Sequence, residues 1–138
     1  MDTNIIVDIL MVRKYELDSI SEIFTLAEKG MIDLYISESV ITTTFYILRK
    51  DKKIDTLSAF REICKIVNVI PFAKDVLYHP VEKYNDIEDG ILYFLAAKAR
   101  MNYFLTRNVK DFIFTFPSFP VMSPTNFLKD IYFNDIPQ

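Results

Sequence analysis

Residues 86–112 read DIEDGILYFLAAKARMNYFLTRNVKDF, and this stretch decides the fold class. Residues 86–101 are predicted to form a helix, because the segment is long and mostly apolar and its acidic residues gather in the first turn. Residues 103–106 are predicted to be a short buried strand, and a polar loop follows directly. A helix that leads into a buried strand is typical of α/β proteins with parallel sheets.

The rest of the chain alternates in the same way. Further helices are predicted over residues 3–11, 18–29, 39–50, 54–67, 74–83 and 125–133, and further strands over 31–37, 68–70 and 119–122. Asp2 is placed to cap the first helix, Asp18 or Ser19 to cap the second, and Gly30 to end it. The fold class is therefore α/β, a three-layer α/β/α sandwich with a parallel central sheet. The 138 residues suffice for one domain, residues 1–138.

Composition removes several classes of function. Cys64 and His79 are the only residues of their types, which excludes an internal disulfide and a multi-histidine metal cage, and both are interpreted as structural. Two glycines are too few for a glycine-rich phosphate loop. The longest apolar run covers residues 91–97, far short of the roughly 20 residues that cross a bilayer. Asp2 stands where a signal peptide would be basic, so we expect a cytoplasmic protein without membrane contact.

Acidic residues gather at three junctions between predicted elements: at Asp2, at residues 86–89 and at residues 106–111. Sites in parallel α/β sheets form beyond the carboxyl ends of the strands, so these acids are expected at one edge. Asp89 heads the buried face of its helix, where a carboxylate needs a cation nearby. Oxygen ligands favour Mg²⁺ or Mn²⁺. Capping is the alternative, and Asp2 and Asp86 also fit that role.

The acidic residues and their surroundings resemble the PIN domain, the nuclease fold of VapC-type toxins. The resemblance is carried by Asp2-Thr3-Asn4, by residues 86–89 with their apolar helix, and by residues 106–112, 121–124 and 127–128. Their order and spacing fit the family across essentially the whole chain. The segment TRNVKDF at 106–112 is the most specific part.

The resemblance implies a ribonuclease that cuts RNA phosphodiesters with Mg²⁺ or Mn²⁺ and serves as the toxin of a type II toxin–antitoxin pair. Carried over by position, it implies three metal ligands: Asp2, Asp89 and Asp111. The implied catalytic set adds Glu88 and Asn108, and the implied substrate-binding residues are Thr106, Arg107 and Lys110. Thr106 would orient its neighbours through its hydroxyl, and Asn4 would brace the first loop. An antitoxin protein and a homodimer are the expected protein partners.

Two positions depart from the family pattern. Thr43 stands where many members have a glutamate, and Glu88 or Asp86 is expected to take its place. The family has a central strand before its first aspartate, whereas only Met1 precedes Asp2 here, so the first central strand is expected to be truncated or to lie upstream. The alternative to an active nuclease is therefore a catalytically impaired PIN-fold module that binds RNA or a protein without cleavage.

Two further features leave alternatives open. Phe112, Phe114, Phe116 and Phe119 crowd the loop after Asp111, where they would stack on bases or form an apolar surface for a protein partner. A phosphoryl-acceptor domain would also cluster aspartates at strand ends. It is disfavoured because the middle strand ends at residues 70–72, which carry no acid.

Overall fold

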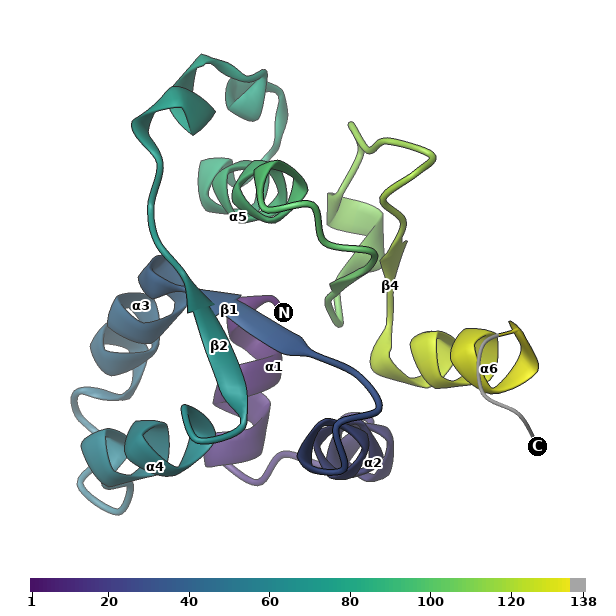
Figure 1. Cartoon of the computed structure of the whole chain (residues 1–138). Coiled ribbons are helices and arrows are strands. Elements are labelled where there is room, and N and C mark those ends of the chain that lie inside the picture. The colour runs from purple at the N-terminus through teal and green to yellow at the C-terminus, as the bar shows by residue number, and fades with distance from the viewer. Residues whose placement is uncertain (135–138) are drawn as a thin grey trace.

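A computed structural model describes residues 1–134, in which helices alternate with short strands. The helices are α1 (Thr3–Leu10), α2 (Leu17–Glu28), α3 (Glu38–Leu48), α4 (Thr56–Ile63), α5 (Ile87–Lys98) and α6 (Pro124–Asn134). The strands are β1 (Leu34–Ser37), β2 (Val67–Ile70), β3 (Phe104–Leu105) and β4 (Val121–Met122). Three short 3₁₀ helices are η1 (Lys74–Tyr78), η2 (Val81–Lys83) and η3 (Val109–Asp111). In Figure 1, α5 lies on one side of β1 and β2, and α1, α3 and α4 lie on the other.

The strands form two parallel pairs that the N-terminus joins. β1 pairs with β2 and β3 pairs with β4, and both pairs are parallel as predicted. The Met1 amino group donates to the Tyr35 carbonyl oxygen in β1 at 2.8 Å, and the Asp2 N–H donates to the Leu105 carbonyl oxygen in β3 at 2.8 Å. The parallel α/β class is confirmed. Within residues 1–134, however, the central sheet consists of two strand pairs bridged by two residues.

Several predicted boundaries are wrong, each for a local reason. β1 begins at Leu34 rather than at residue 31, and α4 ends at Ile63 because Val67 already pairs with Leu34 in β2. The predicted helix over residues 74–83 is two 3₁₀ turns with Pro80 between them, which lacks the N–H that a continuous helix needs. Cys64, which the sequence analysis interpreted as structural, follows the last residue of α4 and is exposed.

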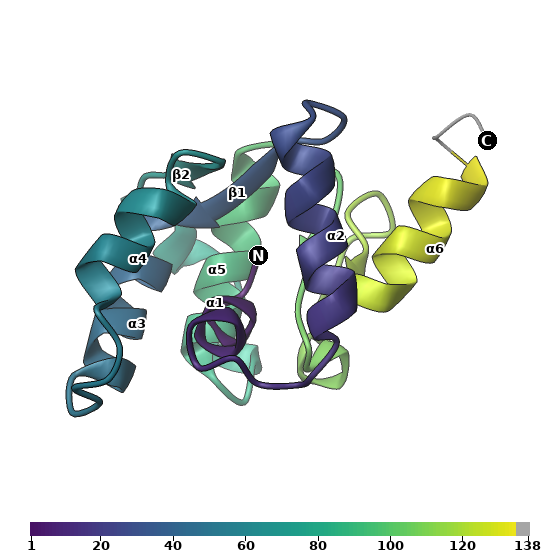
Figure 2. The same cartoon turned by 90° about the horizontal axis from the view of Figure 1, so that it is seen from below.

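The start of α2 is set by a distant contact rather than by the predicted caps. Its N-cap is Glu16, in the left-handed region with φ 51°, and not Asp18 or Ser19. The Glu16 carboxylate instead accepts a hydrogen bond from the Thr125 N–H at 2.9 Å, in the first turn of α6. Figure 2 shows the resulting arrangement, with α2 and α6 side by side. The C-terminal end of α2 is as predicted, with Gly30 at φ 73°.

Helix α5 is the centre of the core and positions the acidic residues at its own N-terminus. Five consecutive residues, 92–96, are buried, so α5 is covered on nearly all sides. The fully buried Tyr93 donates its hydroxyl to the Phe119 carbonyl oxygen and accepts from the Phe116 N–H, both at 2.8 Å. A Cβ at Gly90 would lie 3.0 Å from the Tyr84 ring, so only glycine lets η2 and Tyr84 pack against this turn. No helix within residues 1–134 is long and apolar enough to span a membrane.

Candidate active site

Asp2 is held by hydrogen bonds from three neighbours. It is buried, and its Oδ1 accepts from the Thr3 N–H at 2.7 Å, as the predicted N-cap role requires. Its Oδ2 accepts from the Thr106 hydroxyl at 2.7 Å and from the Asn4 amide at 3.1 Å. Burial raises the pKa of Asp2, and the Thr106 and Thr3 hydrogen bonds oppose that shift. Asp2 is therefore fixed in orientation before any ligand arrives.

The loop that follows β3 is attached to the first turn of α1. Thr106 is fully buried, and its hydroxyl oxygen also accepts from the Asn4 amide at 3.2 Å and from the Asn108 N–H at 3.1 Å. The Arg107 N–H donates to the Asn4 side-chain oxygen at 3.3 Å. Thr106 thus orients Asp2 and the 106–108 loop, and it presents no side-chain surface to a substrate.

The sequence analysis did not predict an ion pair between α1 and the 106–108 loop. Asp8 is 1% exposed, and its carboxylate accepts from Arg107 Nε at 2.9 Å and pairs with Arg13 at 3.5 Å. The Arg107 guanidinium also lies 4.5 Å from the centre of the Tyr15 ring. The one available signal was an acid inside the apolar run of residues 5–10, because a buried carboxylate requires a partner. Its partner is 99 residues away, so local spacing could not identify it.

The acids at the start of α5 approach those of α1 and of the 106–111 loop. Asp86 caps α5 by accepting from the Glu88 N–H at 3.0 Å, which confirms its capping role. Asp89 is half-buried, and burial raises its pKa to about 7. The carboxylates of Asp2, Asp86, Asp111 and Glu88 raise the Asp89 pKa further, in that order. The structure thus brings acids from three separate segments of the sequence close enough to repel one another.

Glu88 lies beside Thr43 of α3. Burial raises the pKa of Glu88, and hydrogen bonds from the Thr43 and Thr3 hydroxyls oppose the shift. The Thr3 hydroxyl is 3.5 Å from Glu88 Oε1. Glu88 therefore extends from α5 toward the place on α3 where the resemblance puts a glutamate in other members. Glu38, the acidic residue of α3, accepts from the Phe72 N–H at 2.8 Å instead.

The remaining candidates lie on the loop after β3. Asn108 precedes η3, Asp111 ends it, and Lys110 between them is exposed. Within residues 1–134, no three histidine, cysteine or acidic side chains already surround one point as a metal cage would. The donors are nevertheless of the type that Mg²⁺ and Mn²⁺ prefer, and a cation would relieve the repulsion that raises the Asp89 pKa. The residues present therefore fit a divalent cation.

Comparison with known proteins gives the class of this fold and site. The family model described as PIN domain matches residues 1–110, and the chain belongs to the PIN domain family. The chain is also 33% identical, over 94% of its length and 92% of the relative's, to Ribonuclease VapC1 of Aquifex aeolicus (strain VF5). No solved structure matches the chain significantly.

Proposed function

We propose that this protein is a metal-dependent endoribonuclease and the toxin of a type II toxin–antitoxin pair. One observation carries the proposal: burial raises the Asp89 pKa, and Asp2 and Asp111, from two distant segments, lie close enough for their charges to add to that rise, which reaches about 7. Its similarity to a protein named Ribonuclease VapC1 supports RNA as the substrate. The natural place of action for such an enzyme is the cytoplasm.

In this proposal Asp2, Asp89 and Asp111 hold Mg²⁺ or Mn²⁺. When bound, the ion supplies charge neutralisation at the scissile phosphate and makes an attacking water more acidic. Asn108 and Glu88 complete the catalytic set with an amide and a further carboxylate. Thr106 keeps Asp2 oriented through its 2.7 Å hydrogen bond. Half-burial of Asp89 reduces competition from bulk water.

Two basic residues of the 106–111 loop are proposed to contact RNA. Lys110 is exposed beside Asp111 and can reach a phosphate. Arg107 uses Nε for Asp8, and its planar guanidinium has further N–H groups for a phosphate. Tyr15, 55% exposed beside Arg107, offers a ring on which a base of single-stranded RNA can stack.

A second candidate function is binding without cleavage. It is favoured by the lack of a ready-made metal cage within residues 1–134 and by threonine at position 43. Such a module would bind RNA or a protein through the same edge without hydrolysing the backbone. The two functions differ in one measurable property, which is metal-dependent turnover.

The deciding experiment is cleavage of a labelled single-stranded RNA with Mg²⁺, Mn²⁺ or EDTA. Wild type is compared with Asp89→Asn and with a matched control, Asp18→Asn, which removes an acid from the first turn of α2. Cleavage that needs metal and is lost only in Asp89→Asn, by a factor of 100 or more, supports the nuclease. RNA binding without cleavage in all three proteins would instead establish the binding module.

The proposed protein partners are an antitoxin and a second copy of the chain. Exposed apolar side chains on α3 and on the segment after β2 support a protein partner: Phe45, Tyr46, Ile47, Phe72, Leu77 and Tyr78. Of the phenylalanines after Asp111, Phe114 and Phe116 remain exposed, whereas Phe112 and Phe119 are buried. Light scattering of the purified chain tests the homodimer. Co-expression with the product of a neighbouring small gene, followed by loss of RNA cleavage, tests the antitoxin.

A further inference from the structure

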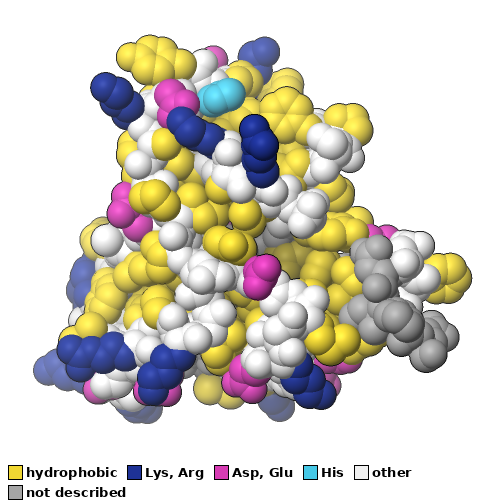
Figure 3. Space-filling model, viewed as in Figure 1, with side chains coloured by type: hydrophobic (Ala, Val, Ile, Leu, Met, Phe, Trp, Pro, Cys, Tyr) yellow, Lys and Arg dark blue, Asp and Glu magenta, His cyan; other side chains and the backbone are white. Residues whose placement is uncertain are grey.

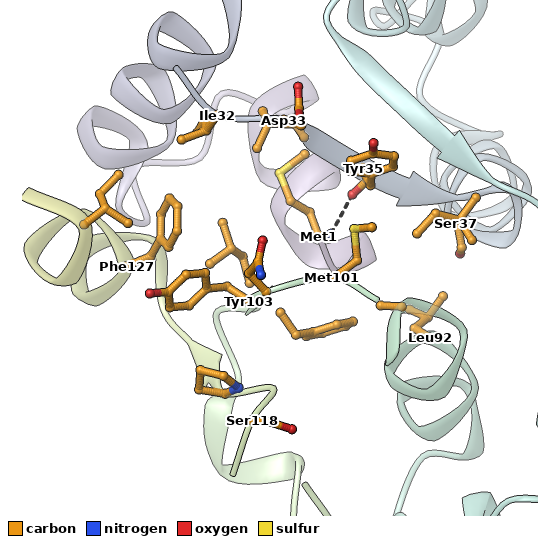
Figure 4. A pocket seen from close by; sticks show the side chains of 18 of the residues that line it. Met1, Ile32, Asp33, Tyr35, Ser37, Leu92, Met101, Tyr103, Ser118 and Phe127 are labelled. Atoms are coloured by element: carbon orange, nitrogen blue, oxygen red, sulfur yellow. Dashed lines mark hydrogen bonds between the residues drawn. The ribbon is translucent and has the colours of Figure 1, made fainter. Parts of the chain in front are cut away.

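A large cavity between β1 and β3 does not suit RNA. It has a volume of about 800 Å³, and Figure 3 shows a hollow with hydrophobic side chains around it on this face of the molecule. Of the residues within 1–134 that line it, most are apolar and none is lysine or arginine. Figure 4 shows Asp33 among them, and its carboxylate would repel a phosphate. Contacts to the RNA backbone must therefore come from another part of the molecule.

The turn that ends α1 brings a second arginine to Asp8. The Arg13 N–H donates to the Asp8 carbonyl oxygen at 2.9 Å, and the Val12 N–H donates to the Ile9 carbonyl oxygen at 3.1 Å. These two bonds form a Schellman motif, which requires a left-handed backbone at its central position. Val12 has φ 51°, although this conformation is unfavourable for a β-branched residue. The chain thus accepts local strain in the turn that directs Arg13 back to Asp8.

The Asp8 carboxylate holds one guanidinium with each oxygen. Its Oδ2 accepts from Arg107 Nε at 2.9 Å, and its Oδ1 lies 3.5 Å from a terminal nitrogen of Arg13. One carboxylate between two arginines leaves an excess of positive charge. The side chains of Arg13 and Arg107 are 39% and 31% exposed, so nitrogens that do not face Asp8 can meet an anion. Glu16, the one acid in residues 11–16, accepts instead from the Thr125 N–H.

Tyr15 adds an aromatic ring to this pair of arginines. The Arg107 guanidinium lies 4.5 Å from the ring centre, and 55% of the residue remains exposed. A cation on one face orients the ring and leaves its other face for a base. Only an unpaired strand can turn a base out to stack on a side chain, so the ring favours single-stranded RNA.

The pair of arginines lies along α1 from Asp2. Asp8 is six positions after Asp2, which corresponds to about 9 Å along a helix that rises about 1.5 Å per residue. A phosphate bound by Arg13 and Arg107 is therefore not the one that a metal on Asp2 would contact. Arg107 connects the two places, because its side chain pairs with Asp8 and its N–H donates to Asn4 at 3.3 Å.

We propose that Arg13 and Arg107 together bind a non-scissile phosphate of single-stranded RNA, and that Tyr15 stacks on a base next to it. The inference rests on the proposed function for RNA as the ligand. It adds a second arginine, a particular phosphate and a preference for unpaired strands. RNA fits better than an acidic peptide, because a peptide carboxylate would use the arginines and leave the ring without a role.

The test measures binding of a labelled single-stranded RNA of about ten nucleotides by fluorescence anisotropy, in EDTA and between about 50 and 200 mM salt. The variants are Arg13→Gln, which keeps a donor for Asp8, and Tyr15→Leu. Arg49→Gln and Tyr46→Leu are the matched controls. The Arg49 guanidinium also lies over an exposed ring, 3.9 Å from the centre of Tyr46, but it donates to a backbone carbonyl rather than to a carboxylate.

The two variants should weaken binding in different ways. Arg13→Gln should reduce the slope of log affinity against log salt by about 0.7, the value for one phosphate of a single strand. Tyr15→Leu should weaken binding about tenfold without changing the slope, because stacking releases no counterions. Both controls should bind as wild type does, and a duplex of the same sequence should not respond to Tyr15→Leu.

Each other result overturns the proposal. Equal slopes for Arg13→Gln and Arg49→Gln would mean that charge acts diffusely, and unchanged binding by Tyr15→Leu would remove the base contact. Displacement of RNA by polyglutamate as effective as that by unlabelled RNA would assign the site to an acidic peptide. Absence of RNA binding by wild type at the lowest salt would also overturn it.

The outcome is separable from that of the nuclease proposal. Binding as expected in a chain that does not cleave RNA would refute the nuclease alone. Metal-dependent cleavage by wild type, together with unchanged RNA binding by Arg13→Gln, would refute this phosphate site alone.

Discussion

The carboxylates on the two sides of the candidate active site are surrounded in opposite ways. The α1 side consists of Asp2, Asn4, Asp8, Thr106 and Arg107. The α5 side consists of Asp86, Glu88, Asp89 and Asp111. On the α1 side, buried Asp2 and Asp8 accept hydrogen bonds at 2.7 to 3.1 Å from threonine, asparagine and arginine donors. On the α5 side, by contrast, burial raises the pKa of Asp89, and the nearby carboxylates, Asp2 first among them, raise it further, to about 7.

This difference separates positioning from ligand affinity. Donors fix the α1 side, so it can hold Asp2 in one orientation at no further entropic cost. The α5 side carries electrostatic repulsion that a cation would remove, so its cost without metal becomes affinity when metal binds. Mutations should therefore lower stability on the α1 side and raise it on the α5 side.

The largest effect is expected from Arg107→Met. The substitution keeps much of the side chain's length but leaves the buried Asp8 with only Arg13, whose nearest nitrogen is 3.5 Å away. Removing one partner of a buried ion pair costs about 3 kcal/mol of unfolding free energy. Urea unfolding measures the loss. Lys110→Met is the matched control, because it removes an exposed charge from the same loop, and equal losses in the two variants would contradict the role given to Asp8.

A smaller loss of stability is expected from Thr106→Val. The variant keeps the shape of the side chain but removes one donor to Asp2 and the acceptor of the Asn108 N–H. Leaving such buried groups unsatisfied costs about 1–3 kcal/mol. Urea unfolding is compared with that of Thr42→Val, which loses only an exposed bond to the Ser39 carbonyl. If both valine variants unfold alike, the hydroxyl of Thr106 does not anchor Asp2.

The sequence could predict those site residues that lie close together in the chain, and not those brought together by contacts between distant segments. Asp86, Glu88 and Asp89 follow one another in a strong helix, so the sequence predicted the α5 side. It also predicted that Thr106 orients its neighbours. The Asp8–Arg107 pair joins residues 99 apart, and no local pattern indicates it. Helix α5 itself was predictable because it is long and apolar.

The bounds of the short strands were also hard to predict from local sequence. β3 and β4 have only two residues each, too few for a clear alternation of side chains, so their ends were predicted too long. Their pairing depends on packing around α5.

Asp89→Asn should stabilise the metal-free protein as the pH rises. A carboxyl whose pKa is about 7 in the folded state, against 3.8 ordinarily, binds its proton more tightly when folded. Its stabilising contribution is complete below about pH 4 and is lost as the pH rises through 7. In EDTA, the variant should therefore unfold at nearly the wild-type temperature at about pH 4 and about 2–5 °C above it at pH 8.

If Asp89 is a ligand, bound metal should reverse the order of the two unfolding temperatures, so that wild type unfolds above Asp89→Asn. Adding Mn²⁺ at pH 8 should raise the unfolding temperature of wild type and leave that of Asp89→Asn nearly unchanged. Asp18→Asn serves as the control and should follow wild type at every pH. Parallel curves for wild type and Asp89→Asn across this pH range would show that the folded protein does not raise the Asp89 pKa.

The smallest effect is expected from Glu88→Gln, and it sharpens the comparison within the α5 side. Glu88 is the weakest of the four carboxylates that raise the Asp89 pKa, so its loss should weaken Mn²⁺ binding less than tenfold. Because Glu88 lies beside Thr43, a Glu88→Gln, Thr43→Glu double variant moves the carboxylate from α5 to α3 within the same space. Calorimetric titration should show Mn²⁺ affinity restored in the double variant and not in Thr43→Gln, Glu88→Gln. If the carboxylate on α3 restores nothing, the position on α5 matters in itself, and Glu88 does not stand in for the glutamate of other members.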